Sequence, residues 1–243
     1  RGGSVIGLGT IVNTAGIALG GAVGFFFGRF FKERLRETLN MACGVSVLCI
    51  GVAGTMEGML SIAGGSIGSG RSMFVTLCLV LGGLVGEIIN IEGFFERFGE
   101  WLKVRTGNGG DNRFTEGFVT ASLTVCIGAM AVVGSIEDGI YGDPSVLITK
   151  SVLDLIIVLT MTCSMGIGCA FSAVPVAMLE GLMTFAARLL KPLMTEAALA
   201  NLSLIGSILI FCVGVNLVFG KRIRVANLLP GLVIAVGAAF IPS

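Results

Sequence analysis

Residues 5–28 read VIGLGTIVNTAGIALGGAVGFFFG, a stretch without one charged side chain. A helix needs about 20 mainly apolar residues to cross the ~30 Å hydrocarbon core of a bilayer, so this stretch is long enough to span it. Membrane-barrel strands are about 10 residues long and alternate in polarity, whereas this stretch is continuously apolar. We therefore expect a transmembrane α-helix, and lipid is the environment in which its polar residues must be judged.

The rest of the chain repeats this pattern. Hydrophobic residues make up 54% and charged residues 13% of the 243 positions, whereas about a quarter are charged in soluble proteins. Eight stretches approach spanning length: 5–28, 38–60, 72–91, 115–134, 147–171, 173–190, 198–219 and 226–242. The sequence thus predicts an all-α protein, a single polytopic transmembrane helical domain over residues 1–243. Stretch 173–190 is short and begins near Pro175, so it either crosses the membrane or re-enters it.

Lys and Arg are distributed unevenly between the two sets of loops that eight spans define. One set holds eleven of them: Arg29, Lys32, Arg34, Arg36, Arg97, Lys103, Arg105, Arg113, Lys221, Arg222 and Arg224. The other holds five: Arg1, Arg71, Lys150, Arg188 and Lys191. Cytoplasmic loops are enriched in Lys and Arg, so we expect both termini outside and the first, third and seventh loops inside.

Composition argues against several classes of function. A net charge of +1 offers no basic field for nucleic acid. The seven cysteines form no CxxC pair and the chain has no His, so we expect no metal site and no cofactor. The commonest general base is therefore missing, and an enzyme is not expected. An enzyme of membrane lipids would need Glu116, Glu137 and Asp138 gathered at one surface.

Residues 92–104 differ from the spans, because aromatic residues recur there at helical spacing among charged ones. The segment contains Phe94, Phe95, Phe98 and Trp101. This pattern predicts an interfacial amphipathic helix. It serves either as an anchor on the membrane surface or as a lipid sensor or partner-docking helix.

Glycine recurs every fourth residue along the first span, at Gly16, Gly20, Gly24 and Gly28. Such a stripe lets another helix backbone approach closely, which is typical of helix interfaces in lipid. The stripe predicts a packing interface, either inside the protein or between copies in a homo-oligomer.

The chain also carries two similar words before its second and seventh spans. RFFKERLRETL at 29–39 is echoed by RLLKPLMTEAAL at 188–199. With eight crossings those spans run in opposite directions, as in transporters built from inverted repeats. We expect inverted repeats of two- to three-helix units.

Ionisable residues inside hydrocarbon are costly and indicate functional sites. Glu180 lies near the middle of span 173–190, with Pro175 upstream and Gly181 beside it. Because burial penalises its charged form, Glu180 could carry a proton or bind a cation. We expect a broken helix near Pro175 and a turn at Gly166 and Gly168. If the segment is re-entrant or lies at the surface, Glu180 is merely solvated.

A second charged pair and several uncharged polar residues complete the candidate pathway. Lys150 and Asp154 are one helical turn apart in span 147–171, so they form either an internal ion pair or a gate. The uncharged candidates are Asn13, Thr14, Thr120, Ser122 and Thr124. Each of these side chains could instead hydrogen-bond within its own helix.

Four strings indicate a family: GTIVNT at 9–14, EGFVTAS at 116–122, a Cys126-x-Gly128 run that leads to SIEDG at 135–139, and RVANLLP at 224–230. Together they resemble the YdfK/YqgA family of uncharacterised multi-pass membrane proteins of bacteria. The resemblance covers nearly the whole chain and implies a bacterial inner-membrane protein. It assigns no activity and no catalytic or binding residue.

Two functions compete on this evidence. The first is a transporter or channel, in which a small polar or charged solute or ion, H+ or another cation included, moves between the helices. The second is a non-transporting scaffold that uses the glycine stripe and the interfacial helix. A transporter should have a water-accessible cavity that reaches the midplane. A scaffold should have Glu180 paired in a dry interior and a glycine-lined contact between subunits.

Overall fold

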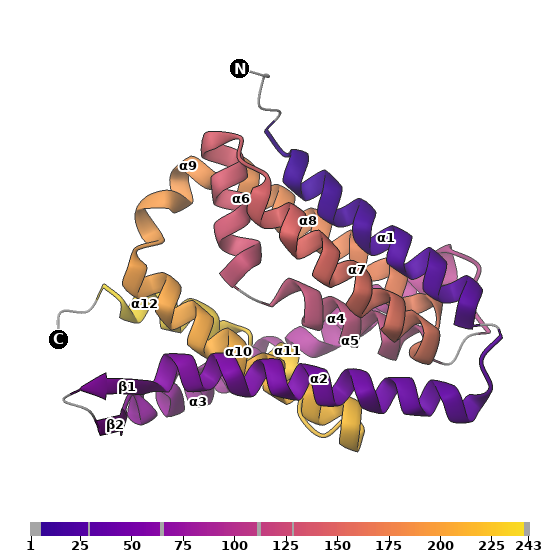
Figure 1. Cartoon of the computed structure of the whole chain (residues 1–243), viewed down its shortest axis with the longest axis horizontal. Coiled ribbons are helices and arrows are strands. Elements are labelled where there is room, and N and C mark those ends of the chain that lie inside the picture. The colour runs from indigo at the N-terminus through magenta and orange to yellow at the C-terminus, as the bar shows by residue number, and fades with distance from the viewer. Residues whose placement is uncertain (1–5, 29, 64–65, 111–112, 128, 241–243) are drawn as a thin grey trace. The chain divides into compact units, whose positions relative to one another are not determined.

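The structure is a computed structural model that describes residues 6–28, 30–63, 66–110, 113–127 and 129–240 (Figure 1). Arg1, Arg29 and Gly128 from the patterns above lie outside these ranges. The fold is all-α, as predicted, with one short hairpin. Its elements are α1 (Leu8–Gly28), α2 (Glu33–Met59), β1 (Leu60–Ala63), β2 (Ser66–Ser69), α3 (Ser72–Ile89), α4 (Ile91–Arg105), α5 (Phe114–Cys126), α6 (Ala129–Tyr141), α7 (Ser145–Met165), the 3-10 helix η1 (Ile167–Ser172), α8 (Ala173–Phe185), α9 (Ala187–Leu190), η2 (Lys191–Leu193), α10 (Glu196–Phe219), α11 (Val225–Leu228) and α12 (Pro230–Ala238).

The long helices make this a polytopic membrane protein. Six of them are long and apolar enough to cross a bilayer: α1, α2, α3, α7, η1 with α8, and α10. Helices α5 and α6 pass the same test together, but their axes meet at 63°. Residues 225–238 form a shorter apolar stretch. The described residues therefore supply six long spans, a seventh if the bent pair counts as one, and a shorter stretch where the eighth is predicted.

The chain divides into two compact units. Unit 1 comprises Arg1–Cys43 and Phe95–Pro192, and unit 2 comprises Gly44–Phe94 and Leu193–Ser243. Each unit thus combines an early and a late part of the sequence.

In unit 1 the glycine stripe of α1 packs against α7 (Figure 1). A Cβ added at Gly16 would lie 2.3 Å from the Ser151 hydroxyl, and one at Gly20 would lie 2.4 Å from the Leu155 carbonyl oxygen. The register continues in steps of four on both helices, from Gly24 with Leu159 to Gly28 with Cys163. Because both numbers rise together, α1 and α7 are parallel. The stripe is therefore used inside the protein.

Helix α8 runs along α1 in the opposite direction. Thr10 hydrogen-bonds Thr184, and Asn13 hydrogen-bonds Glu180, so residue numbers fall on one helix as they rise on the other. Pro175 lies in the first turn of α8, where the missing N–H costs no helical hydrogen bond. The broken helix expected near Pro175 is therefore absent from the described chain. The expected turn is present, because α7 ends at Met165 and the next residue, Gly166, has φ 98°.

The interruption occurs instead between α5 and α6. Helix α5 starts beside η1, because a Cβ at Gly168 would meet the carbonyl of Phe114. Helix α6 reaches the start of α1, where Asp138 accepts a hydrogen bond from Gly9. The two helices thus cover the length of α1 between them, and the chain turns at Ile127, whose ψ of 119° is extended rather than helical. No proline lies at this break in the sequence, so no local residue predicts it.

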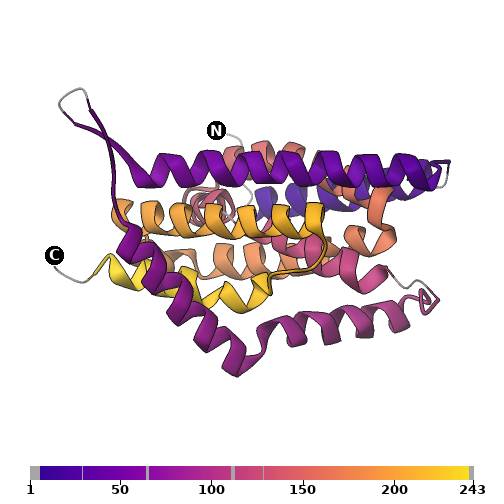
Figure 2. The ribbon, with the colours of Figure 1, turned by 90° about the horizontal axis from the view of Figure 1, so that it is seen from below.

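Unit 2 is built on an antiparallel pair of helices, α10 and the part of α2 that belongs to this unit (Figure 2). Gly51 faces Phe211, and Gly58 faces Leu204, so the numbers run in opposite senses. Strands β1 and β2 pair antiparallel after α2. Helices α3, α10 and α12 pack around buried Cys78, Ile205 and Ala235. Opposite directions for the second and seventh spans agree with the repeat hypothesis, but inverted repeats stay a prediction.

Helix α4 covers the segment predicted to be amphipathic. Phe98 stacks on Trp101 and contacts Phe118 of α5, and Leu102 is buried in unit 1. Trp101 remains 57% exposed. One face of the helix thus packs on protein, and its position at a membrane surface stays a prediction.

The substitution Gly20→Ala should destabilise the protein by about 1–3 kcal/mol, because the added methyl overlaps a main-chain carbonyl that cannot move aside. The matched control is Gly181→Ala, since a Cβ there meets nothing within 4 Å. We expect the control to stay within ~1 kcal/mol of wild type. The check is the free energy of unfolding of purified protein titrated with denaturing detergent. Equal effects at both positions would contradict the α1–α7 contact.

Candidate functional site

Asn13 lies at the centre of a buried polar cluster in unit 1. Its side-chain nitrogen donates to Glu180 Oε1 at 2.8 Å and to Asp154 Oδ2 at 3.2 Å. Asn13 is 0%, Glu180 1% and Asp154 4% exposed. Three predicted pathway residues from α1, α7 and α8 therefore meet away from solvent.

Lys150 completes this charged cluster, which from here on means Asn13, Lys150, Asp154 and Glu180. Its ammonium group donates to the Val125 carbonyl oxygen at 2.8 Å, pairs with Asp154 and lies 3.7 Å from Glu180 Oε1. An ammonium has three N–H donors, of which Val125 and Asp154 accept two, while Glu180 interacts by charge from beyond hydrogen-bond distance. The predicted Lys150–Asp154 pair is thus part of a larger network.

The Val125 carbonyl is available because α5 ends one residue later. The last carbonyls of a helix have no partner in the next turn, and they carry partial negative charge. The backbone N–H of Ile127 bonds the Leu123 carbonyl, and its extended backbone then leaves the helix. Lys150 therefore caps the broken end of α5 with a positive charge.

The charges of the charged cluster do not balance when both carboxyl groups are ionised. One ammonium then faces two carboxylates in a buried site, which is unfavourable. Glu180 Oε2 and Asn13 Oδ1 have no hydrogen-bond partner among the described residues. A proton on Glu180 or a small bound cation would balance the charge.

Buried polar residues continue from the charged cluster to the end of unit 1 at which α1 begins, which we call the far end. Thr10 and Thr184 hydrogen-bond at 3.2 Å. Asp138 is fully buried and accepts from the backbone N–H groups of Gly7 and Gly9 at 3.3 and 3.0 Å. Sequence reasoning missed this role, because a distant carboxylate that caps α1 leaves no local signal.

The opposite end of unit 1, where α1 stops at Gly28 and α5 starts, carries Arg36 and Arg113, and we call it the basic end. Arg36 donates to the Gly28 carbonyl at 2.6 Å, and Arg113 pairs with Glu33 at 2.7 Å. A pocket of about 230 Å³ opens there, lined by Glu33, Arg36, Glu37, Asn40, Arg113, Glu116, Ser164 and Met165. Three of its side chains are carboxylates and two are guanidinium groups.

The remaining predicted pathway residues behave differently from one another. Thr124 donates to the Thr120 carbonyl of its own helix at 2.8 Å, which is the structural alternative named above. The hydroxyls of Thr14 and Ser122 are buried and lack a partner within the described part of the chain. Glu116 lies at the basic end and Asp138 at the far end, so they do not gather at one surface as a lipid enzyme would require.

Unit 2 holds a second polar group that sequence reasoning also missed. Asn227 donates to Glu87 at 2.6 Å and accepts from the backbone N–H of Glu92 at 2.8 Å. Glu92 is 5% exposed and pairs with Lys221, and Glu87 pairs with Arg224. These bonds tie the α3–α4 corner to the start of α11.

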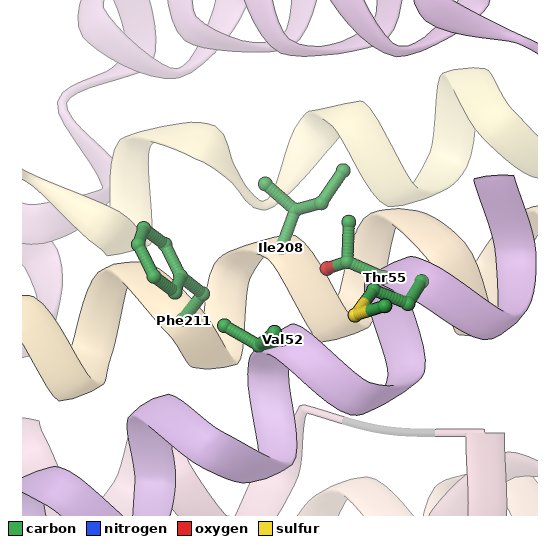
Figure 3. A pocket seen from close by; sticks show the side chains of 5 residues that line it. Val52, Thr55, Ile208 and Phe211 are labelled. Atoms are coloured by element: carbon green, nitrogen blue, oxygen red, sulfur yellow. The ribbon is translucent and has the colours of Figure 1, made fainter. Parts of the chain in front are cut away.

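An apolar pocket of about 210 Å³ also lies in unit 2, between α2 and α10 (Figure 3). Its lining residues are Val52, Thr55, Met56, Ile208 and Phe211. None of these five side chains is charged, so the pocket offers no ionisable group.

Comparisons with known proteins place the chain among uncharacterised membrane proteins. A family model described as "Protein of unknown function (DUF554)" matches residues 8–240. The uncharacterized protein YqgA of Escherichia coli is 26% identical over 94% of each chain. The uncharacterized membrane protein YdfK of Bacillus subtilis is 26% identical over 93% of each chain. No solved structure matches.

The substitution Lys150→Met should destabilise the protein by about 3–5 kcal/mol, because it leaves two carboxylates and the end of α5 without their cation. Adding Asp154→Asn should recover part of this loss, since it removes one of the uncompensated charges. The control is Lys32→Met at an exposed position, with an expected change below ~0.5 kcal/mol. Unfolding free energies in detergent measure all three. A double variant no more stable than Lys150→Met would contradict the coupling.

Proposed function

The chain belongs to the DUF554 family, whose function is unknown, and we propose that this membrane protein transports a proton or a small cation through unit 1. The charged cluster is the site at which the ion binds. Glu180 takes up the ion, Asn13 and Asp154 orient it, and Lys150 is the built-in counter-ion. Enzymatic chemistry has no part in this proposal.

One observation carries the proposal. Two carboxylates share one ammonium inside a membrane-spanning unit, and each of Glu180 and Asn13 keeps an oxygen without a partner among the described residues. Charged groups at this depth are costly unless they are used. Such sites occur in transporters where a discontinuous helix presents its end to the ion, and α5 ends beside Lys150 here.

The geometry suggests how binding is coupled to movement. Lys150 is attracted to the carboxylates and to the end of α5 at the same time. A proton or cation at Glu180 weakens the attraction between Lys150 and Glu180 by neutralising the carboxylate. The attraction between Lys150 and the end of α5 changes when Glu180 is neutralised. The turn at Ile127 is the place where α5 and α6 can then reorient. Alternating access through this hinge opens the charged cluster to one end of unit 1 at a time.

We further propose that the protein lies in the bacterial inner membrane, with the basic end in the cytoplasm and both termini outside. The charge distribution of the loops supports this orientation. The parallel register of α1 and α7 supports the crossing count on which this orientation depends, because parallel spans need an odd number of crossings between them. Helix α2, helix α3 and the bent α5–α6 pair supply three.

A scaffold is the second candidate, and the burial and pairing of Glu180 favour it. The glycine stripe of α1, however, is already occupied by α7. A scaffold or homo-oligomer would therefore need another surface, such as the exposed Trp101 and Val104 of α4. We rank it below transport because the uncompensated carboxylate has no role in it.

Flux measurements in proteoliposomes test the proposal. We expect wild type to dissipate an imposed proton or monovalent-cation gradient, and Glu180→Gln to reduce the flux to background, because the amide cannot take up a proton. The matched control is Glu57→Gln, which changes an exposed carboxylate of α2 and should keep wild-type flux. Background flux for wild type across protons, Na+, K+ and small organic cations would count against transport.

A further inference from the structure

An apolar layer closes the charged cluster on the side that faces the basic end. It consists of Ile17, Val125, Val158 and Val176, one residue from each of α1, α5, α7 and α8, and all are 2% exposed or less. Three of these residues lie four positions from members of the charged cluster, namely Asn13, Asp154 and Glu180. The layer is therefore one helical turn, about 5 Å, deeper along the same helices.

One further turn toward the basic end, polar side chains return on three helices. Ser122 precedes Val125 by three residues, Thr162 follows Val158 by four, and Ser172 precedes Val176 by four. The three side chains are 0%, 2% and 0% exposed. Residues three or four apart share a helix face, so these hydroxyls lie on the faces that carry the apolar layer.

The hydroxyls of Ser122, Thr162 and Ser172 have no hydrogen-bond partner within the described ranges. Buried Ser and Thr usually bond a carbonyl of their own helix. Thr124, Thr160 and Ser164 do so in this unit. An unsatisfied buried hydroxyl is unfavourable, and three at one depth on three helices indicate a shared partner.

We propose that Ser122, Thr162 and Ser172 form a second ion station, which holds a monovalent cation with its remaining water on the basic-end side of the apolar layer. This inference rests on the proposed transport function and adds the path that the ion takes. The apolar layer is the barrier between the station and the charged cluster. The cation occupies the station and the charged cluster in turn as the barrier opens and closes.

The chemistry of the station selects the class of ion. Its three side chains are neutral oxygen ligands without a carboxylate. Divalent ions such as Mg²⁺ hold their water tightly and are usually bound through carboxylates, so neutral hydroxyls suit a singly charged, partly hydrated cation. The neighbouring charged cluster carries surplus negative charge, which disfavours an anion on the same path.

The pocket at the basic end lies next along this path. Its lining residue Glu116 is six residues from Ser122 on α5, about 9 Å along the helix axis, and Ser164 follows Thr162 by two residues. Three carboxylates line that pocket. Cations would therefore meet the pocket first, the station second and the charged cluster last.

Thiol labelling tests the station directly. Ser122→Cys, Thr162→Cys and Ser172→Cys are each introduced into the full chain after the seven native cysteines are replaced by Ala. A membrane-impermeant cationic methanethiosulfonate is then applied to membrane vesicles of either orientation. We expect labelling from the basic end only, slowed by a high concentration of the transported cation. Val158→Cys and Val176→Cys in the apolar layer are the controls and should label more slowly than the three station positions, because water reaches them only while the barrier is open.

Protection of all three positions from both sides, or labelling from the far end, would overturn the station. Failure of transport gives a different result: the three cysteines label from the basic end while wild type shows only background flux. If flux is normal and depends on Glu180 while the three cysteines stay unlabelled, the transport proposal stands and the station is wrong.

Flux in the native-cysteine chain gives a second readout that needs no cysteine replacement. Ser122→Ala, Thr162→Val and Ser172→Ala combined should raise the half-saturating cation concentration by about tenfold, because the ion loses its ligands before the barrier. Thr160→Val is the matched control, since the Thr160 hydroxyl bonds its own helix. An unchanged half-saturating concentration in the triple variant would also overturn the station.

Discussion

The ammonium group of Lys150 needs acceptors and opposite charge in an interior that excludes water, and the rest of unit 1 is arranged around that need. Asp154 and the Val125 main-chain carbonyl accept its hydrogen bonds, and Glu180 adds a second carboxylate at 3.7 Å. The carbonyls of the last helical turn have no partner within the helix, and the end of α5 at this depth offers one of them to Lys150. The turn at Ile127, the approach of α8 and the position of Asn13 all serve the same buried charge.

The parts of the fold that local sequence determines could be predicted. Long apolar stretches identify the main helices, and the cost of charge in lipid singles out Lys150, Asp154 and Glu180. Their meeting point could not be predicted, because Asn13 and Glu180 are 167 residues apart. The break in the helix at Ile127 could not be predicted from the sequence for a related reason. It is stabilised by Lys150 from another helix, whereas Pro175, the local signal, only begins a helix.

Helix ends impose the same requirement elsewhere in the protein. The first N–H groups of a helix need acceptors, and at low water activity a distant carboxylate can supply them. Asp138 does this for α1, and Glu92 accepts from Ala226 in the first turn of α11. Neither role follows a sequence rule, since each carboxylate lies more than a hundred residues from the helix end that it caps.

The parallel seam between α1 and α7 also has a consequence for biosynthesis. Gly24 and Cys163, which meet in that seam, are 139 residues apart. At about 5–20 residues per second, the ribosome needs roughly 7–28 seconds to make the chain between them. During that interval α1 is in the membrane with Asn13 and a bare glycine face unpaired. An insertion factor or chaperone that shields nascent helices would have its greatest effect here, on the first helix rather than the last.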